Sequence, residues 1–162
     1  MAAMSEESPT AGAGPAIFKL VRFWSRRWAS GVSGRPDADH APVPHVLVVE
    51  AVDTVAGSAP EEAEVTVADV AYQLGIDRSV ASRMVADAQA AGLITRDASS
   101  RDARRARVRL TDAGLELLVA AHAWQQQQFD ALVAGWDPAD RDRLAAYVLR
   151  VAAQVLGPAP KS

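Results

Sequence analysis

The sequence predicts a mainly α-helical fold with one small two-stranded β-sheet, an α+β arrangement with helices at both ends of the chain. Two observations lead to this prediction. Within residues 65–111, two short helical patterns separated by a glycine turn precede two strand patterns that enclose an arginine-rich loop. Long amphipathic patterns lie before and after this stretch. The central order of elements is the outline of a winged helix-turn-helix.

The first short helix has clear start and stop signals. The Thr66 hydroxyl can accept a hydrogen bond from an exposed backbone amide of the first turn. The side chain of Asp69, three residues later, can accept one in return from the backbone amide at the start of the helix. Gly75 is expected to end the helix, because glycine adopts a left-handed conformation without a Cβ penalty. Apolar residues recur between these signals at helical spacing, at Val67, Val70, Ala71 and Leu74.

The second short helix is predicted to start after Asp77 as its N-cap. Its inward positions are Val80 or Ala81, Met84, Val85 and Ala88. Its outward positions are Arg78, Ser79, Ser82, Arg83 and Ala86. Small and hydrogen-bonding side chains with two guanidinium groups suit a helix that enters the major groove of DNA, where bulky aliphatic residues would collide with base edges.

Residues 93–96 and 106–110 are predicted to form two strands, and residues 97–105 the loop, or wing, between them. From residue 96 to residue 109 there are six arginines and two aspartates, a local net charge of +4. Such a cluster is suited to contact phosphates or the minor groove.

Four sequence motifs, in order and spacing, resemble those of the MarR-type transcriptional regulators, which are dimeric bacterial winged-helix proteins. They are LGIDRS at 74–79 followed by SR at 82–83, AGLI at 91–94, the wing pattern Asp102-x-Arg104, and LT at 110–111 with Gly114. The resemblance implies a regulator that binds double-stranded DNA as a homodimer, acting as a ligand-responsive repressor.

The resemblance also implies roles for single residues. Ser79, Ser82 and Arg83, beside Arg78, match base-facing positions of the recognition helix. Arg104 matches the wing arginine that reaches toward the minor groove, and Asp102 matches the acid that orients the wing. Two positions depart from the family pattern. Ala103 stands where many relatives have a second arginine, for which Arg101 or Arg105 can substitute, and Ala81 replaces a bulkier inward residue.

The charge of the chain is unevenly distributed. The 162 residues carry a net charge of −3, which at first argues against a nucleic-acid partner. Residues 65–111, however, hold eight arginines and five aspartates, a net charge of +3, which leaves −6 for the rest. A basic reading surface on an acidic body limits indiscriminate binding to DNA.

Composition excludes several classes of protein. There is no cysteine, so disulfides, thiolate metal sites and thiol-based sensing are excluded, and a reducing cytoplasm fits. We find no cleavable leader pattern and no apolar run of membrane-spanning length, so secretion and membrane insertion are not expected.

The N-terminal part is predicted to be a disordered tail at 1–14 and a dimerisation region at 15–64. An amphipathic helix from Pro15 presents Ile17, Leu20, Val21, Trp24 and Trp28 on one side. Such a stripe fits a membrane surface or a partner protomer, and the partner is the more ordinary explanation. A flexible linker at 31–44 precedes a second helix at 45–56, whose β-branched content leaves a strand alternative open.

After the winged unit at 65–111, residues 112–157 are predicted to form C-terminal dimerisation helices, followed by a tail at 158–162. A long apolar stripe starts near Asp112, and Asp137 with Pro138 restarts a helix. The buried face of the last helix is expected at Leu144, Val148, Val151, Ala152 and Val155. More apolar surface than one small domain can cover argues for a symmetric dimer.

Catalysis is not expected, because the three histidines are scattered and no nucleophile, phosphate-loop or metalloprotease motif occurs. No cofactor is expected. Asp37, Asp39 and His40 could bind a metal, but linker acids are more often simply hydrated. A small aromatic or lipophilic effector could bind Trp24, Trp28 and His45, with Trp124 or Trp136 as further candidates, although such aromatics are more often core or interface residues. The rival class is a winged-helix module that binds proteins without reading DNA.

Overall fold

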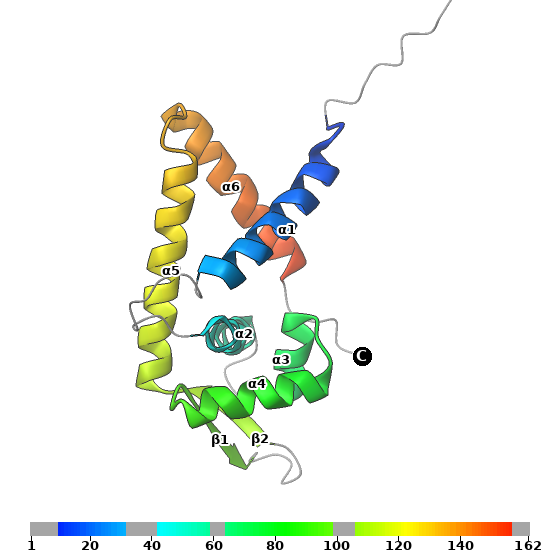
Figure 1. Ribbon diagram of the computed structural model, residues 1–162, viewed down its shortest axis with the longest axis vertical. Coiled ribbons are helices and arrows are strands. Elements are labelled where there is room, and N and C mark those ends of the chain that lie inside the picture. Colours follow the sequence, from blue (N-terminus) through cyan, green and yellow to red (C-terminus); the bar gives the residue numbers. More distant parts are fainter. Residues whose placement is uncertain (1–9, 32–41, 59–63, 99–105, 157–162) are drawn as a thin grey trace, which may run out of the picture. The chain divides into compact units, whose positions relative to one another are not determined.

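The computed structural model describes residues 10–31, 42–58, 64–98 and 106–156 (Figure 1). The chain divides into two compact units, Met1–Val43 and Pro44–Ser162. The first holds helix α1 (Ala13–Gly31). The elements that follow are α2 (Val43–Ser58), α3 (Val67–Leu74), α4 (Arg78–Ala90), β1 (Ile94–Ala98), β2 (Ala106–Leu110), α5 (Asp112–Leu132) and α6 (Pro138–Val155). The predicted fold class, a winged helix-turn-helix with flanking helices, is confirmed.

Strands β1 and β2, which we call the wing sheet, pair antiparallel with Ile94 opposite Leu110. The chain just before α3 joins the free edge of β2, where the Val108 amide donates to the Val65 carbonyl over 2.8 Å. The second strand has the predicted bounds. The first differs from the prediction, because it starts at Ile94 and extends to Ala98, so Asp97 is a strand residue and not part of the loop.

Helix α2 is buried on several sides. Val48, Val49, Ala51 and Val52 are all at most 2 % exposed. Because Val43–Ser58 is helical, the strand alternative for this segment is wrong, and its β-branched content reflects burial. Val48, Ala51 and Val52 pack in one core with buried residues of α3, α4, β1 and β2.

The two short helices have the same ending. Gly75 has φ 63° and Gly92 has φ 75°, both left-handed. In each case the glycine amide and the next amide donate back to the last turn: Ile76 to the Ala71 carbonyl, and Leu93 to the Ala88 carbonyl. This glycine-dependent closure satisfies carbonyls that would otherwise lack partners. At the start of α3, Thr66 and Asp69 form the predicted reciprocal cap.

The start of α5 is joined tightly to the end of the α4–β1 turn. The Thr111 amide donates to the Leu93 carbonyl over 3.1 Å, and the Thr111 hydroxyl donates to the Gly92 carbonyl over 2.7 Å. Gly114 lies in the first turn of α5, where an added Cβ would overlap the Leu93 carbonyl oxygen. Only a glycine therefore allows α5 to pass this close to the turn.

The flanking helices leave much apolar surface uncovered. On α5 only Gly114 and Leu118 are buried, and α6 has no buried residue. The predicted buried face of α6 is wrong for the single chain, since Val148, Val151 and Val155 are at least half exposed. On α1, considered by itself, the exposed apolar residues are Ile17, Phe18, Leu20, Val21 and Phe23. None of the helices in the described ranges is long and apolar enough to cross a membrane.

Replacing Gly114 by alanine is expected to lower the free energy of unfolding by about 1–3 kcal/mol, the usual cost of overpacking. The loss should appear even though alanine favours a helix interior over glycine. Chemical denaturation followed by circular dichroism measures it.

The matched control is Gly135→Ala, because nothing lies within 4 Å of a Cβ added there. This variant is expected to change the unfolding free energy by less than about 0.5 kcal/mol. Equal stability of the two variants would contradict the close approach of α5 to Leu93.

Candidate nucleic-acid interface

Helix α4 has one buried face and one exposed face. Ala81, Val85 and Ala88 have no exposed surface, and they pack in the core shared with α3 and the wing sheet. Arg78, Ser79, Arg83 and Ala86 are exposed, and Ser82 is intermediate. The exposed part of the helix therefore carries two guanidinium groups and two hydroxyls, which are donors and acceptors suited to base edges and phosphates.

Ala81, where the resemblance implies a larger inward residue, has no exposed surface. Val80 and Met84 are half-buried, so of the two alternatives at 80 and 81 it is Ala81 that occupies the inward position. Asp77 stands at the predicted N-cap of this helix, although its side chain makes no capping hydrogen bond.

The wing residues predicted to contact DNA, Arg101, Arg104 and Arg105, and the orienting Asp102 lie outside the described residues. What the structure describes is the sheet from which this segment leaves. Its positive charges are Arg96, which is half-buried, and Arg107 and Arg109 on β2.

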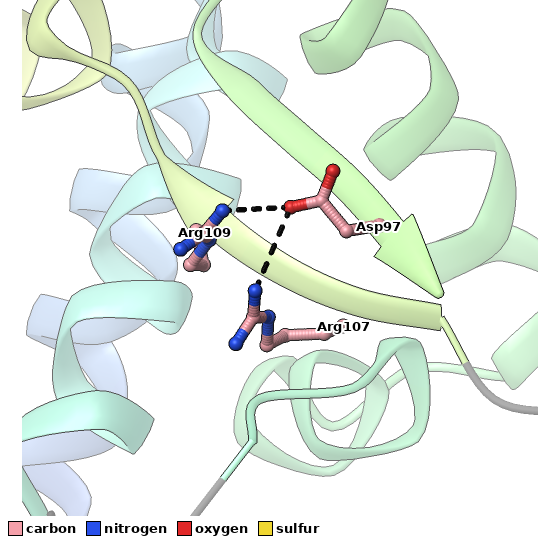
Figure 2. A network of polar contacts seen from close by, with 3 residues as sticks. All are labelled: Asp97, Arg107 and Arg109. Carbon is pink, nitrogen blue, oxygen red and sulfur yellow. Dashed lines mark hydrogen bonds and ion pairs between the residues drawn. The ribbon is translucent and has the colours of Figure 1, made fainter. Parts of the chain in front are cut away.

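An acid on β1 contacts both arginines of β2 (Figure 2). Arg109 Nη2 donates to Asp97 Oδ2 over 2.9 Å, and Arg107 Nη2 lies 3.9 Å from the same oxygen. Sequence reasoning missed this cluster because it placed Asp97 in the loop. The strict alternation of arginine with apolar residues at 106–110 was the available signal, since it places both arginines on one face of the strand.

Three of the predicted effector residues have described side chains. His45 is half-buried on α2, and Trp124 on α5 and Trp136 after it are partly exposed. The side chains of Trp24 and Trp28 lie outside the described residues, as do Asp37, Asp39 and His40. Within the described ranges, there is no group of three or more histidine, aspartate or glutamate side chains close enough together to hold a metal ion.

A hydrogen bond that the sequence did not predict joins α2 to α5. Gln125 Nε2 donates to Glu50 Oε1, across 75 residues of sequence. Gln125 belongs to a four-glutamine tract that has no distinctive pattern of its own, so nothing local pointed to this contact.

Comparisons with known proteins agree with the fold. A model of the MarR family matches residues 42–105. A MarR family protein from Bacillus stearothermophilus has a similar structure, with TM-score 0.67 and 13% identity over 91% of this chain and 96% of the other. No curated protein matches the sequence.

Two further solved structures resemble this chain. Staphylococcus aureus MepR in complex with DNA has TM-score 0.60 and 16% identity, covering 86% of this chain and 97% of MepR. Bordetella bronchiseptica BpsR, whose DNA binding is regulated by 6-hydroxynicotinic acid, has TM-score 0.56 and 19% identity, covering 85% and 98%. The family match covers the whole helix-turn-helix, and the structural matches extend through the flanking helices. The chain therefore has the winged-helix fold, and residues 42–105 within it match the MarR family model.

Proposed function

We propose that the protein is a sequence-specific regulator that binds double-stranded DNA as a homodimer, with α4 as its recognition helix. The observation that carries this proposal is the exposed α4 face with Arg78, Ser79 and Arg83, held outward by the fully buried Ala81, Val85 and Ala88. The DNA-bound structure of MepR, which resembles this chain, supports it. On this proposal the protein acts by binding, in the cytoplasm, and not by catalysis.

The homodimer is supported by the uncovered apolar side chains of the flanking helices. Val148, Leu149, Val151 and Val155 on α6 are all at least half exposed. Positions 148, 151 and 155 share one face of the helix by their spacing, and an exposed apolar face of this kind marks an association surface. A twofold dimer would present two recognition helices about 34 Å apart, to half-sites of a near-palindrome of roughly 16–20 base pairs.

The regulatory step is proposed to be release of DNA by a small aromatic or lipophilic effector, which makes the protein a repressor that competes with polymerase. The DNA binding of BpsR, whose structure resembles this chain, is regulated by 6-hydroxynicotinic acid, which supports this proposal. His45 on α2, with Trp24 and Trp28, would contribute to the binding site. An effector can act only by binding the misaligned dimer more tightly than the aligned one.

The experiment that tests DNA binding is selection of sites from a random duplex pool, followed by affinity measurements on the selected site between about 50 and 200 mM salt. Neutralisation of phosphates by arginines predicts a steep fall of affinity with salt. An association that is insensitive to salt would instead favour the protein-docking module.

Arg83→Ala is expected to weaken binding to the selected site by about 1–3 kcal/mol and to relax the preference at one base position. Random duplex should be affected much less. Fluorescence anisotropy on both DNAs measures the difference.

The control for Arg83→Ala is Arg143→Ala on α6, which removes one positive charge from a side chain that is 64 % exposed. It should leave both affinities nearly unchanged. Equal losses on selected and random DNA for Arg83→Ala would mean that Arg83 contacts only phosphate.

Val148→Asp is expected to convert the dimer to monomer in sedimentation velocity, because an unpaired carboxylate in an apolar interface is costly to desolvate. Gln154→Asp, an exposed polar position on the same helix, is the control and should remain dimeric. A wild-type protein that sediments as a monomer at micromolar concentration would contradict the α6 interface.

A further inference from the structure

The wing sheet has a core face and a solvent face, and its register fixes which residues share each. Ile94 and Val108 point to the core and are at most 2 % exposed. Asp97 stands opposite Arg107, and Thr95 stands opposite Arg109. Because side chains alternate along a strand, these four share the other face. The solvent face therefore carries two arginines with one acid between them.

The single acid contacts both arginines through one oxygen (Figure 2). The shorter contact is a charge-assisted hydrogen bond, from Arg109 Nη2 to Asp97 Oδ2 at 2.9 Å. The longer is an ion pair with Arg107 at 3.9 Å. A guanidinium has five donor hydrogens, so a contact through one nitrogen leaves donors on Arg109 that a phosphate could use.

The pair of Asp97 and Arg109 is too exposed to contribute much to the stability of the fold. The side chains of Asp97 and Arg109 are 43 % and 57 % exposed. Ion pairs at such positions contribute little to folding and are screened by salt. The sheet is nevertheless held firmly by its core face, which packs with α3 and α4. Asp97 therefore acts mainly on charge: it lowers the positive charge that the solvent face of the wing sheet presents to a ligand.

The ligand that two adjacent arginines attract most strongly is a phosphate, which matches the guanidinium fork. Phosphates are the part of DNA that carries no sequence information. An acid that occupies these arginines therefore penalises binding to every DNA sequence alike, and it leaves the base contacts of α4 untouched.

We propose that Asp97 is a specificity-determining residue that restrains the attraction of the wing sheet for DNA phosphates, because its carboxylate offsets the positive charge of Arg107 and Arg109. The inference rests on the proposed DNA-binding function and deepens it. Asp97 is separate from Asp102, the acid of the wing motif.

The test compares wild type with Asp97→Asn on a fluorescein-labelled random-sequence duplex, by anisotropy across a salt series. The variant keeps the size of the side chain and removes its charge. It is expected to bind random duplex about two- to fivefold more tightly, the range that one exposed ion pair allows. The slope of log affinity against log salt should steepen by about one, the value for one further phosphate neutralised.

Three further variants separate this explanation from a change in overall charge or in folding. Asp142→Asn on α6 makes the same charge change away from the wing sheet and should have little effect. Asp97→Glu keeps the charge and should bind like wild type. In the Arg109→Gln background, Asp97→Asn should lose most of its gain, because its main partner is absent.

The outcomes distinguish this inference from the proposed function. If wild type binds DNA with a steep salt dependence while Asp97→Asn binds random duplex equally or more weakly, the inference is overturned and the proposed function stands. A gain that persists in the Arg109→Gln background, or that Asp142→Asn reproduces, also overturns it. If wild type shows no salt-dependent DNA binding, the proposed function falls and the inference falls with it.

Discussion

The packing of α4 through small buried side chains is the constraint on which the rest of the interface depends. Ala81, Val85 and Ala88 are all fully buried, so the rotation of the helix about its own axis is fixed by the core. Because helical residues have fixed angular positions, the rotation that buries these three also exposes Arg78, Ser79 and Arg83. The proposed reading surface is thus a consequence of core packing.

The wing sheet is positioned by a second set of backbone contacts. The turn after α4 closes on Gly92, the Leu93 carbonyl accepts from Thr111, and Gly114 lets α5 pass beside it. The edge of β2 is tied to the chain before α3 through Val65 and Val108. Main-chain contacts therefore join α4, the wing sheet and α5. These contacts hold the backbone of the charged sheet residues in place.

The charge of the chain is unevenly distributed between the winged unit and the rest. The chain as a whole is acidic, with net charge −3, while the winged unit is basic. Within that unit Asp97 reduces the local excess on the solvent face of the sheet, beside Arg107 and Arg109. On the proposed function, the acidic body and Asp97 act in the same sense, because both weaken the attraction to DNA phosphates and leave discrimination among sequences to the α4 side chains.

Features that depend on a few consecutive residues could be predicted from the sequence, and features that depend on distant partners could not. The Thr66–Asp69 cap, the left-handed Gly75 and the bounds of β2 all follow from local chemistry. Asp77 has the residue type of a cap without the hydrogen bond, and the end of β1 depends on its pairing with β2. The Glu50–Gln125 contact joins two helices whose approach no local pattern encodes.

The central claim, that the exposed face of α4 meets DNA, can be tested directly because the chain has no cysteine. A photo-crosslinker attached to Ser79→Cys on α4 is compared with one attached to Ala153→Cys, an exposed position on α6. Cross-links to duplex DNA are expected from position 79, and few are expected from position 153. Cross-links from position 153 with none from position 79 would contradict it.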